Sequence, residues 1–138
     1  MFNTLKKLIK NEKGLSLVEL LAVIVILGII AAIAIPAIGN IIANSEAKAE
    51  VADAMQVMSA ANIYFADNPS QTSFAKANAG DYIEGVDNLE SFTVTKASPN
   101  TIVFKGKRVS TTTGLTLDQL SKATVSEGTV KSWPAATN

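Results

Sequence analysis

The chain has 138 residues, which is enough for one small domain and an additional element. Its 12 basic and 12 acidic side chains balance, so no overall electrostatic field points to nucleic acid as a partner. It contains neither cysteine nor histidine, which excludes disulfides, thiol nucleophiles, a Ser-His-Asp triad and most zinc sites. No constellation of carboxylates suggests catalysis, so we expect a protein that is not an enzyme and uses no cofactor or metal.

Charge and hydropathy divide the chain into three zones. Residues 1–14 are short and basic, and their charged residues are Lys6, Lys7, Lys10, Lys13 and Glu12. Residues 20–45 carry no charge and are nearly all Leu, Ile, Val or Ala. A bilayer core is crossed by roughly 20 apolar residues, and a basic start keeps an N-terminus in the cytoplasm. The first two zones therefore predict a membrane span with a cytoplasmic N-terminus.

One long helix is predicted over residues 15–66. Residues 38–66 are dominated by Ala, Met, Glu, Lys and Gln, which favour or tolerate helix, and Asp67-Asn68-Pro69 supplies the stop. At 1.5 Å per residue the helix is about 78 Å long, of which a bilayer accounts for less than half. Spacings of three and four predict an apolar stripe at Ile38, Ile41, Ile42, Val51, Met55 and Met58. The other side is predicted to hold most of Glu46, Lys48, Glu50, Asp53 and Gln56.

After Pro69 the pattern changes to strands and turns. Residues 91–95 alternate, residues 101–104 are β-branched and aromatic, and the turn at 98–100 joins them into a predicted hairpin. A third strand is predicted at 109–112, a short helix capped by Thr116 within 115–123, and a last strand at 130–133.

The fold class is therefore predicted as α+β. A long N-terminal helix, transmembrane in its first half, packs its second half on a small antiparallel sheet. Tyr64 and Phe65 are expected to pack the helix on the sheet, and Trp133 to close the C-terminal end.

Glu19 is the one charge between Lys13 and Glu46, and it lies at the start of the apolar run. An acidic residue is unfavourable by roughly 2.5–3.5 kcal/mol at the centre of a bilayer, and by less near the interface. If the chain is cut after Gly14, the new amine can neutralise Glu19 of its own chain or of an adjacent copy. The second pairing would set the axial register between helices. Alternatively, Glu19 lies near the headgroups and stays hydrated.

Residues 13–19, Lys-Gly-Leu-Ser-Leu-Val-Glu, closely resemble the processing site of type IV prepilins. The resemblance covers residues 10–66 well and the remainder in general layout. It implies that a prepilin peptidase cuts between Gly14 and Leu15 and methylates the amine of Leu15. Glu19 then falls fifth in the mature chain, where the family places its assembly glutamate. Leu15 departs from the phenylalanine usual in the family, and cutting is expected to survive this change.

Pro36 is expected to kink the helix, because it removes one hydrogen bond and clashes with the carbonyl of Ala32. Gly28 and Gly39 lie on either side and lower the helical preference. Pro36 and Gly28 also match a kinking proline and a helix-weakening glycine of the family. We predict a kink with functional flexibility; the alternative is a proline that is merely tolerated, as in many membrane helices.

An ordinary secretory signal is the main rival for the N-terminus, since residues 32–34 resemble a small-x-small cleavage site. Against it, the apolar run continues beyond this site, Pro36 follows almost at once, and Glu19 lies within the run.

The resemblance implies a leader peptide at 1–14, a transmembrane and filament-core helix at 15–44, and an exported pilin domain at 45–138 that includes the second half of the helix. The precursor is expected as a single-pass protein of the cell membrane, and the assembled subunit in an extracellular pilus or cell-surface filament. Expected partners are copies of this chain and other pilins, the prepilin peptidase, and an assembly ATPase with its membrane platform.

Three functions are compatible with these features. The first is a structural subunit of a type IV pilus, and the second is a pseudopilin of a type II secretion or competence DNA-uptake machine. The third belongs to another class: a single-pass membrane protein with a small exported binding domain.

Two charged clusters carry weaker signals. The basic cluster at 105–108 could contact DNA phosphates, although a solvated hairpin turn explains it as well and leaves nucleic acid unsupported as a partner. The acidic residues Asp81, Glu84, Asp87 and Glu90 could bind calcium, but their spacing is not that of an EF-hand, and a solvated loop is the simpler interpretation.

Overall fold

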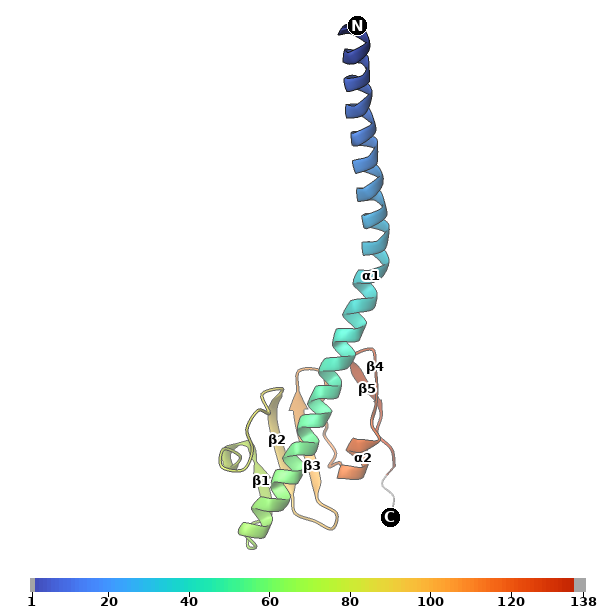
Figure 1. Ribbon diagram of the computed structural model, residues 1–138. Coiled ribbons are helices and arrows are strands. Elements are labelled where there is room, and N and C mark those ends of the chain that lie inside the picture. Colours follow the sequence, from blue (N-terminus) through green and yellow to red (C-terminus); the bar gives the residue numbers. More distant parts are fainter. Residues whose placement is uncertain (1, 136–138) are drawn as a thin grey trace. The chain divides into compact units, whose positions relative to one another are not determined.

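The computed structural model describes the backbone of residues 2–135 and the side chains of residues 16–135. The chain divides into two compact units, Met1–Gly39 and Asn40–Asn138. The elements in chain order are α1 (Phe2–Asp67), β1 (Ser73–Ala75), the 3-10 helix η1 (Lys76–Asn78), β2 (Leu89–Thr95), β3 (Thr101–Gly106), α2 (Leu117–Ser121), β4 (Thr124–Ser126) and β5 (Thr129–Ser132) (Figure 1).

The long helix is confirmed by α1, which begins earlier than predicted and contains Pro36 in its interior. It ends at the predicted stop. The backbone N–H of Asn68 donates to the carbonyl oxygen of Tyr64 at 2.8 Å, and the Asn68 side chain donates to the same oxygen at 3.1 Å. These two bonds satisfy a carbonyl that the last turn leaves free, and Pro69 cannot continue the helix.

The main sheet has three antiparallel strands in the order β1-β2-β3. β2 and β3 confirm the predicted hairpin, with Phe92 opposite Phe104 and Val94 opposite Ile102. β1 pairs with β2 on the other side and places Phe74 opposite Val94. Its three residues were not predicted as a strand, because a run this short shows no alternation from which a strand can be inferred.

The predicted strand at 109–112 is wrong. This segment forms no strand: it meets β3 in an isolated bridge between Lys105 and Ser110, with backbone hydrogen bonds from Gly106 N–H to the Val109 oxygen at 2.7 Å and from Thr111 N–H to the Phe104 oxygen at 2.9 Å. The backbone N–H of Val109 donates to a carboxylate oxygen of Glu50 at 2.7 Å instead of to a neighbouring strand. A side chain of the helix thus takes the hydrogen bond that a strand would have used.

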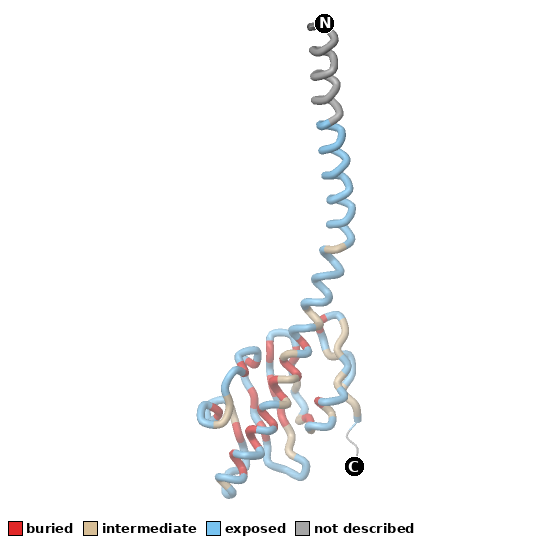
Figure 2. Tube along the Cα trace, viewed as in Figure 1, coloured by how far each residue is buried: buried red, intermediate tan, exposed pale blue. Residues whose placement is uncertain are grey.

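The hydrophobic core lies between the second half of α1 and the three-stranded sheet (Figures 1 and 2). Ala47, Ala54 and Ala61 are spaced by seven, so they share one face of the helix, and all three are 0% exposed. Such small side chains permit a close approach of helix and sheet. Larger apolar side chains fill the space around them, including Val57, Tyr64, Phe65, Phe74, Leu89, Phe92, Val94, Ile102 and Phe104.

The predicted apolar stripe is correct only in the second half of the helix. Val51 and Met58 are buried and Met55 packs partly against the core, whereas the side chains of Ile38, Ile41 and Ile42 are more than half exposed. The predicted polar side is wrong for two acidic residues, because Glu50 and Asp53 are buried.

The predicted C-terminal helix and last strand are confirmed, whereas β4 is a strand that the sequence pattern did not indicate. The Thr116 side chain caps α2 and forms a capping box with Gln119, which satisfies two amides at the start of the helix. β5 confirms the predicted last strand and pairs with β4 in a separate two-stranded sheet. Trp133 packs edge-on against Phe104, with the ring centroids 6.4 Å apart.

Candidate functional site

The first feature of functional interest is the apolar surface of α1 between residues 16 and 42. Every large aliphatic side chain from Leu17 to Ile42 is between 51% and 71% exposed (Figure 2). At about 25 cal/mol per Å² of apolar surface, leaving them in water is unfavourable by tens of kcal/mol. Among the described residues α1 is also the one helix long and apolar enough to cross a membrane. This surface therefore requires lipid or another protein as its cover.

Glu19 is exposed on this apolar surface. Its side chain makes no hydrogen bond or ion pair with any residue that the structure describes. A carboxylate in such surroundings gains from a cation supplied by another group, because the apolar neighbours offer it no donor. The predicted cleavage residues Gly14 and Leu15 lie outside the described side chains, so their role stays a prediction.

The predicted flexible positions all lie inside α1. A Cβ added at Gly28 or at Gly39 would meet nothing within 4 Å, so packing inside the chain does not require glycine at either position. Pro36 does not end the helix. The boundary between the two compact units falls directly after Gly39. The predicted kink and its flexibility stay predictions.

The second feature is the attachment of the loops of the second unit to α1, which centres on Glu50. This side chain is 2% exposed. Its Oε1 accepts hydrogen bonds from the backbone N–H groups of Lys107 and Arg108 at 2.9 and 3.0 Å, and its Oε2 accepts from that of Val109 at 2.7 Å. Three amides thus compensate the carboxylate for the water that it has lost.

Gly106 is necessary for this arrangement, since a Cβ at that position would overlap the Glu50 carboxylate. Two further polar contacts tie loops to the helix. The Asn88 amide donates to the Asp53 carboxylate at 2.8 Å, and the backbone N–H of Gly128 donates to the Asn44 side chain at 2.7 Å. We call Asn44, Glu50 and Asp53 the anchoring residues, because each binds a different loop of the domain.

The helical spacing of the sequence does indicate that Glu50 is buried. Positions 47, 50, 54, 57 and 61 repeat at spacings of three and four, and they hold Ala47, Glu50, Ala54, Val57 and Ala61. All five are at most 2% exposed. Glu50 therefore occupies a core position of the helical repeat, and its polarity is the reason that it was assigned to the surface.

Two residues of the basic cluster at 105–108 form ion pairs, and the acidic residues at 81–90 do not converge on one site. Lys105 forms an ion pair with Glu90 at 2.8 Å, and Arg108 pairs with Glu46. The hydrogen bond and the charge of Lys105 lower the pKa of Glu90, and Glu90 in turn raises the pKa of Lys105. Within residues 16–135 no group of three or more acidic side chains is placed to hold a metal ion.

Residues 9–35 match the family model for the prokaryotic N-terminal methylation motif. This motif is the leader signature of type IV pilins and pseudopilins, and the match includes Gly14, Leu15, Glu19 and Gly28. No solved structure matches the chain.

The motif supports a type IV pilin-like or pseudopilin family, which is structural rather than enzymatic. The family implies polymerisation and processing by a prepilin peptidase. Together with the apolar helix, the motif supports a membrane-anchored precursor.

Proposed function

From a chain that carries the leader signature of type IV pilins and pseudopilins, we propose that this protein is a structural subunit of a type IV pilus. It is cut between Gly14 and Leu15 and polymerises through its N-terminal helix. One observation carries the proposal: the methylation motif lies on a helix whose aliphatic side chains stay exposed from Leu17 to Ile42.

The apolar surface of α1 is buried by two different environments in this scheme. In the precursor the bilayer covers it, and in the filament the helices of neighbouring copies replace the lipid. Leaving the bilayer without that replacement would expose apolar surface worth tens of kcal/mol. Extraction and insertion into the filament must therefore be coupled, which is the task of an assembly ATPase and its membrane platform.

Glu19 supplies the register that an apolar rod lacks. Two apolar helices can slide past each other with little change in energy, since their contacts are non-directional. A pair between the Glu19 carboxylate of one copy and the methylated amine of Leu15 in the next has a single position of closest approach. Burial in the filament strengthens this pair because the local dielectric constant falls.

The anchoring residues hold the domain on its helix without covalent help. The chain has no cysteine, so a filament subunit must resist separation of domain and helix through packing and hydrogen bonds. The Glu50 carboxylate, with three amide donors, is the strongest of these attachments. Gly28, Pro36 and Gly39 provide the points at which the helix can bend during assembly.

The mass of the native N-terminus tests the proposal. Protein from the native assembly is expected to begin at Leu15 with one added methyl group. Gly14→Leu is expected to leave the precursor uncut, whereas Gly28→Leu, a matched change inside the motif but away from the bond, is expected to be cut normally.

A chain that still begins with Met1 in its working assembly would overturn the proposal and favour a single-pass membrane protein. Electron microscopy of the same preparation separates the two filament functions. Extended fibres are expected for a pilus, and their absence from a correctly processed protein would favour a pseudopilin.

A further inference from the structure

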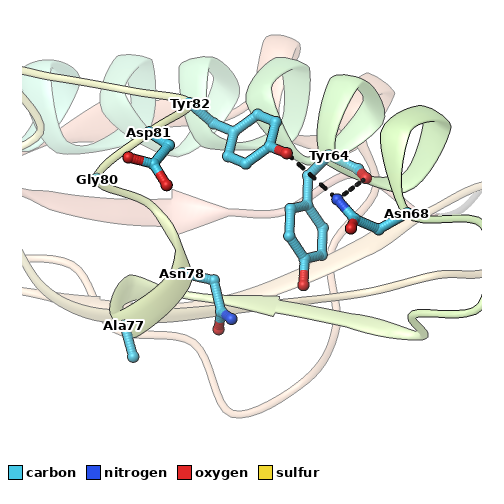
Figure 3. Close-up of a pocket in the computed structure, with 7 residues that line it drawn as sticks. All are labelled: Tyr64, Asn68, Ala77, Asn78, Gly80, Asp81 and Tyr82. Carbon is cyan, nitrogen blue, oxygen red and sulfur yellow. Dashed lines mark hydrogen bonds between the residues drawn. The ribbon is translucent and has the colours of Figure 1, made fainter.

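A hollow of about 500 Å³ lies where the C-terminal end of α1 meets η1 and the residues that follow it (Figure 3). The end of α1 and the residue after it contribute Tyr64 and Asn68, and the facing segment contributes Ala77, Asn78, Gly80, Asp81 and Tyr82. Neither the leader signature nor the apolar segment involves these residues. The hollow is therefore independent of the proposed polymerisation.

Part of this hollow is held rigidly. The Asn68 amide donates to the Tyr82 hydroxyl at 3.2 Å and to the Tyr64 carbonyl oxygen at 3.1 Å. The rings of Tyr64 and Tyr82 pack edge to face with centroids 5.2 Å apart, and the Tyr64 ring also packs on Phe74 at 5.0 Å. The frame is thus preorganised, which lowers the entropic penalty of binding a ligand.

Three other polar groups of the hollow have no partner within the described part of the chain. They are the hydroxyl of Tyr64, the carboxamide of Asn78 and the carboxylate of Asp81. Tyr64 is the most informative, because the residue is only 8% exposed. The hydroxyl oxygen itself is not fully buried, and Figure 3 shows that it points away from α1. A buried ring thus presents its one polar atom to the hollow.

We propose that this hollow binds a neutral saccharide. Vicinal hydroxyl groups can donate together to the Asp81 carboxylate, and the same sugar can accept from the Tyr64 hydroxyl and the Asn78 amide. The volume falls within the roughly 300–1,000 Å³ typical of small-molecule sites. A ligand rich in hydroxyl groups satisfies all three unpartnered groups at once, because each hydroxyl both donates and accepts.

Other ligand classes fit the same groups less well. Asp81 repels an anion, and an apolar ligand would leave the carboxylate, the carboxamide and the phenol without partners. One carboxylate is too few for a resident metal ion. An amine could pair with Asp81 but offers no acceptor to Tyr64 or Asn78.

Binding can be measured with the full chain in a detergent that has no sugar headgroup. The probes are immobilised lactose, N-acetylglucosamine and maltose, with spermidine as the amine probe. At least one saccharide is expected to be retained and to be displaced by the same free sugar. Asp81→Asn is expected to weaken binding about tenfold or more, because it removes a charge-assisted acceptor. Tyr64→Phe, which deletes only the hydroxyl, is expected to weaken it about fivefold.

Asp87→Asn is the matched control, since Asp87 is an exposed carboxylate of the same segment outside the hollow. It is expected to bind as the unchanged chain does. A thermal melt checks that Tyr64→Phe still folds, and Asn78→Ala offers a surface variant that leaves the buried ring in place.

The proposal is overturned if none of the three saccharides is retained, if spermidine is preferred, or if Asp81→Asn and Asp87→Asn behave alike. None of these results bears on N-terminal processing or fibre formation. Failure of the saccharide site and failure of the proposed function are therefore distinguishable.

Discussion

The two halves of α1 show opposite relations between polarity and burial. Between residues 16 and 39 the helix is almost wholly aliphatic and exposed, with Val25 at 52%. Between residues 40 and 67 it carries most of its acidic residues, and Glu50 is 2% exposed. In most domains apolar side chains lie inside and unpaired acidic ones outside. In α1 the environment of each side chain, and not its polarity alone, determines whether the side chain is buried.

This difference has a simple physical origin. The second half of α1 meets a sheet and loops of its own chain, which provide both apolar contacts and free amides. Glu50 is buried because three backbone N–H groups compensate for its lost water. The aliphatic side chains of the first half are exposed, so lipid or other chains must cover them. The helix therefore joins an intramolecular core to a surface made for intermolecular contact.

The largest expected effect distinguishes the two glutamates of α1. Glu19→Val is expected to leave the precursor in the membrane and to abolish or scramble filament formation, because helices lose their register. Thermal unfolding of the domain is expected to be unchanged, since Glu19 is exposed and lies outside the unit Asn40–Asn138. Fibre counts by electron microscopy and a melting curve measure the two properties. Normal fibres from this variant would contradict the register role.

Glu50→Ala is expected to have the opposite effect, because it destabilises the domain and leaves Glu19 unchanged. It leaves three backbone amides without their acceptor, two of them partly and one fully buried, so a loss of about 3 kcal/mol in the free energy of unfolding is expected. Urea unfolding can be followed through Trp133, the single tryptophan of the chain. Glu46→Gln is the control, because the exposed pair with Arg108 is worth about 0–1 kcal/mol. Equal effects of the two substitutions would show that burial of Glu50 is unimportant.

The same substitution in the two halves of α1 is expected to change the stability of the domain only in the second half. Val57→Ala removes two methyl groups from a side chain that is 0% exposed and is expected to destabilise the domain by about 2 kcal/mol. Val25→Ala makes the same change at a side chain that is 52% exposed, and about 0 kcal/mol is expected. The same urea titration measures both. A clear destabilisation by Val25→Ala would mean that the first half of α1 packs on its own chain.

The smallest expected effect is on the pKa of Glu90, an exposed carboxylate of the domain. Lys105 lowers the pKa of Glu90, first through their hydrogen bond and then through its charge. The stabilisation from this pair is therefore fully present above the ordinary carboxyl pKa and is lost as the pH falls through the lowered value. An NMR titration should find the pKa of Glu90 below its usual range, and Lys105→Gln should restore it. Glu127, whose pKa is lowered by Lys131, is the internal control and should not respond.

Much of the fold was predictable because local signals agreed with the tertiary structure. The apolar run and the stop at Asn68-Pro69 gave the helix and its end, and alternation with a turn gave the β2–β3 hairpin. The predictions are wrong where a side chain of one element accepts hydrogen bonds from the backbone of another. Glu50 was assigned to the surface and residues 109–112 to a strand, and both errors share one cause: the carboxylate binds the loop amides.

The two candidate sites differ in the same way, since one is predictable from the sequence and the other is not. The motif around Gly14 and Glu19 is local in sequence, so sequence analysis alone identifies it. The hollow beside Tyr64 is formed by residues from two separate segments, and no spacing in the sequence indicates that Asp81 and Tyr64 line the same hollow. A site of that kind requires the structure.

Thiol labelling of intact fibres tests most directly whether copies of the chain cover the first half of α1. The chain has no cysteine, so Ile30→Cys and Ile63→Cys each introduce a single thiol, at positions that are 56% and 57% exposed in the subunit. In membrane-free fibres treated with a water-soluble maleimide, Ile30→Cys is expected to stay unlabelled until the fibres are dissolved in SDS, whereas Ile63→Cys reacts directly. Labelling of Ile30→Cys in intact fibres at the rate of Ile63→Cys would contradict the account.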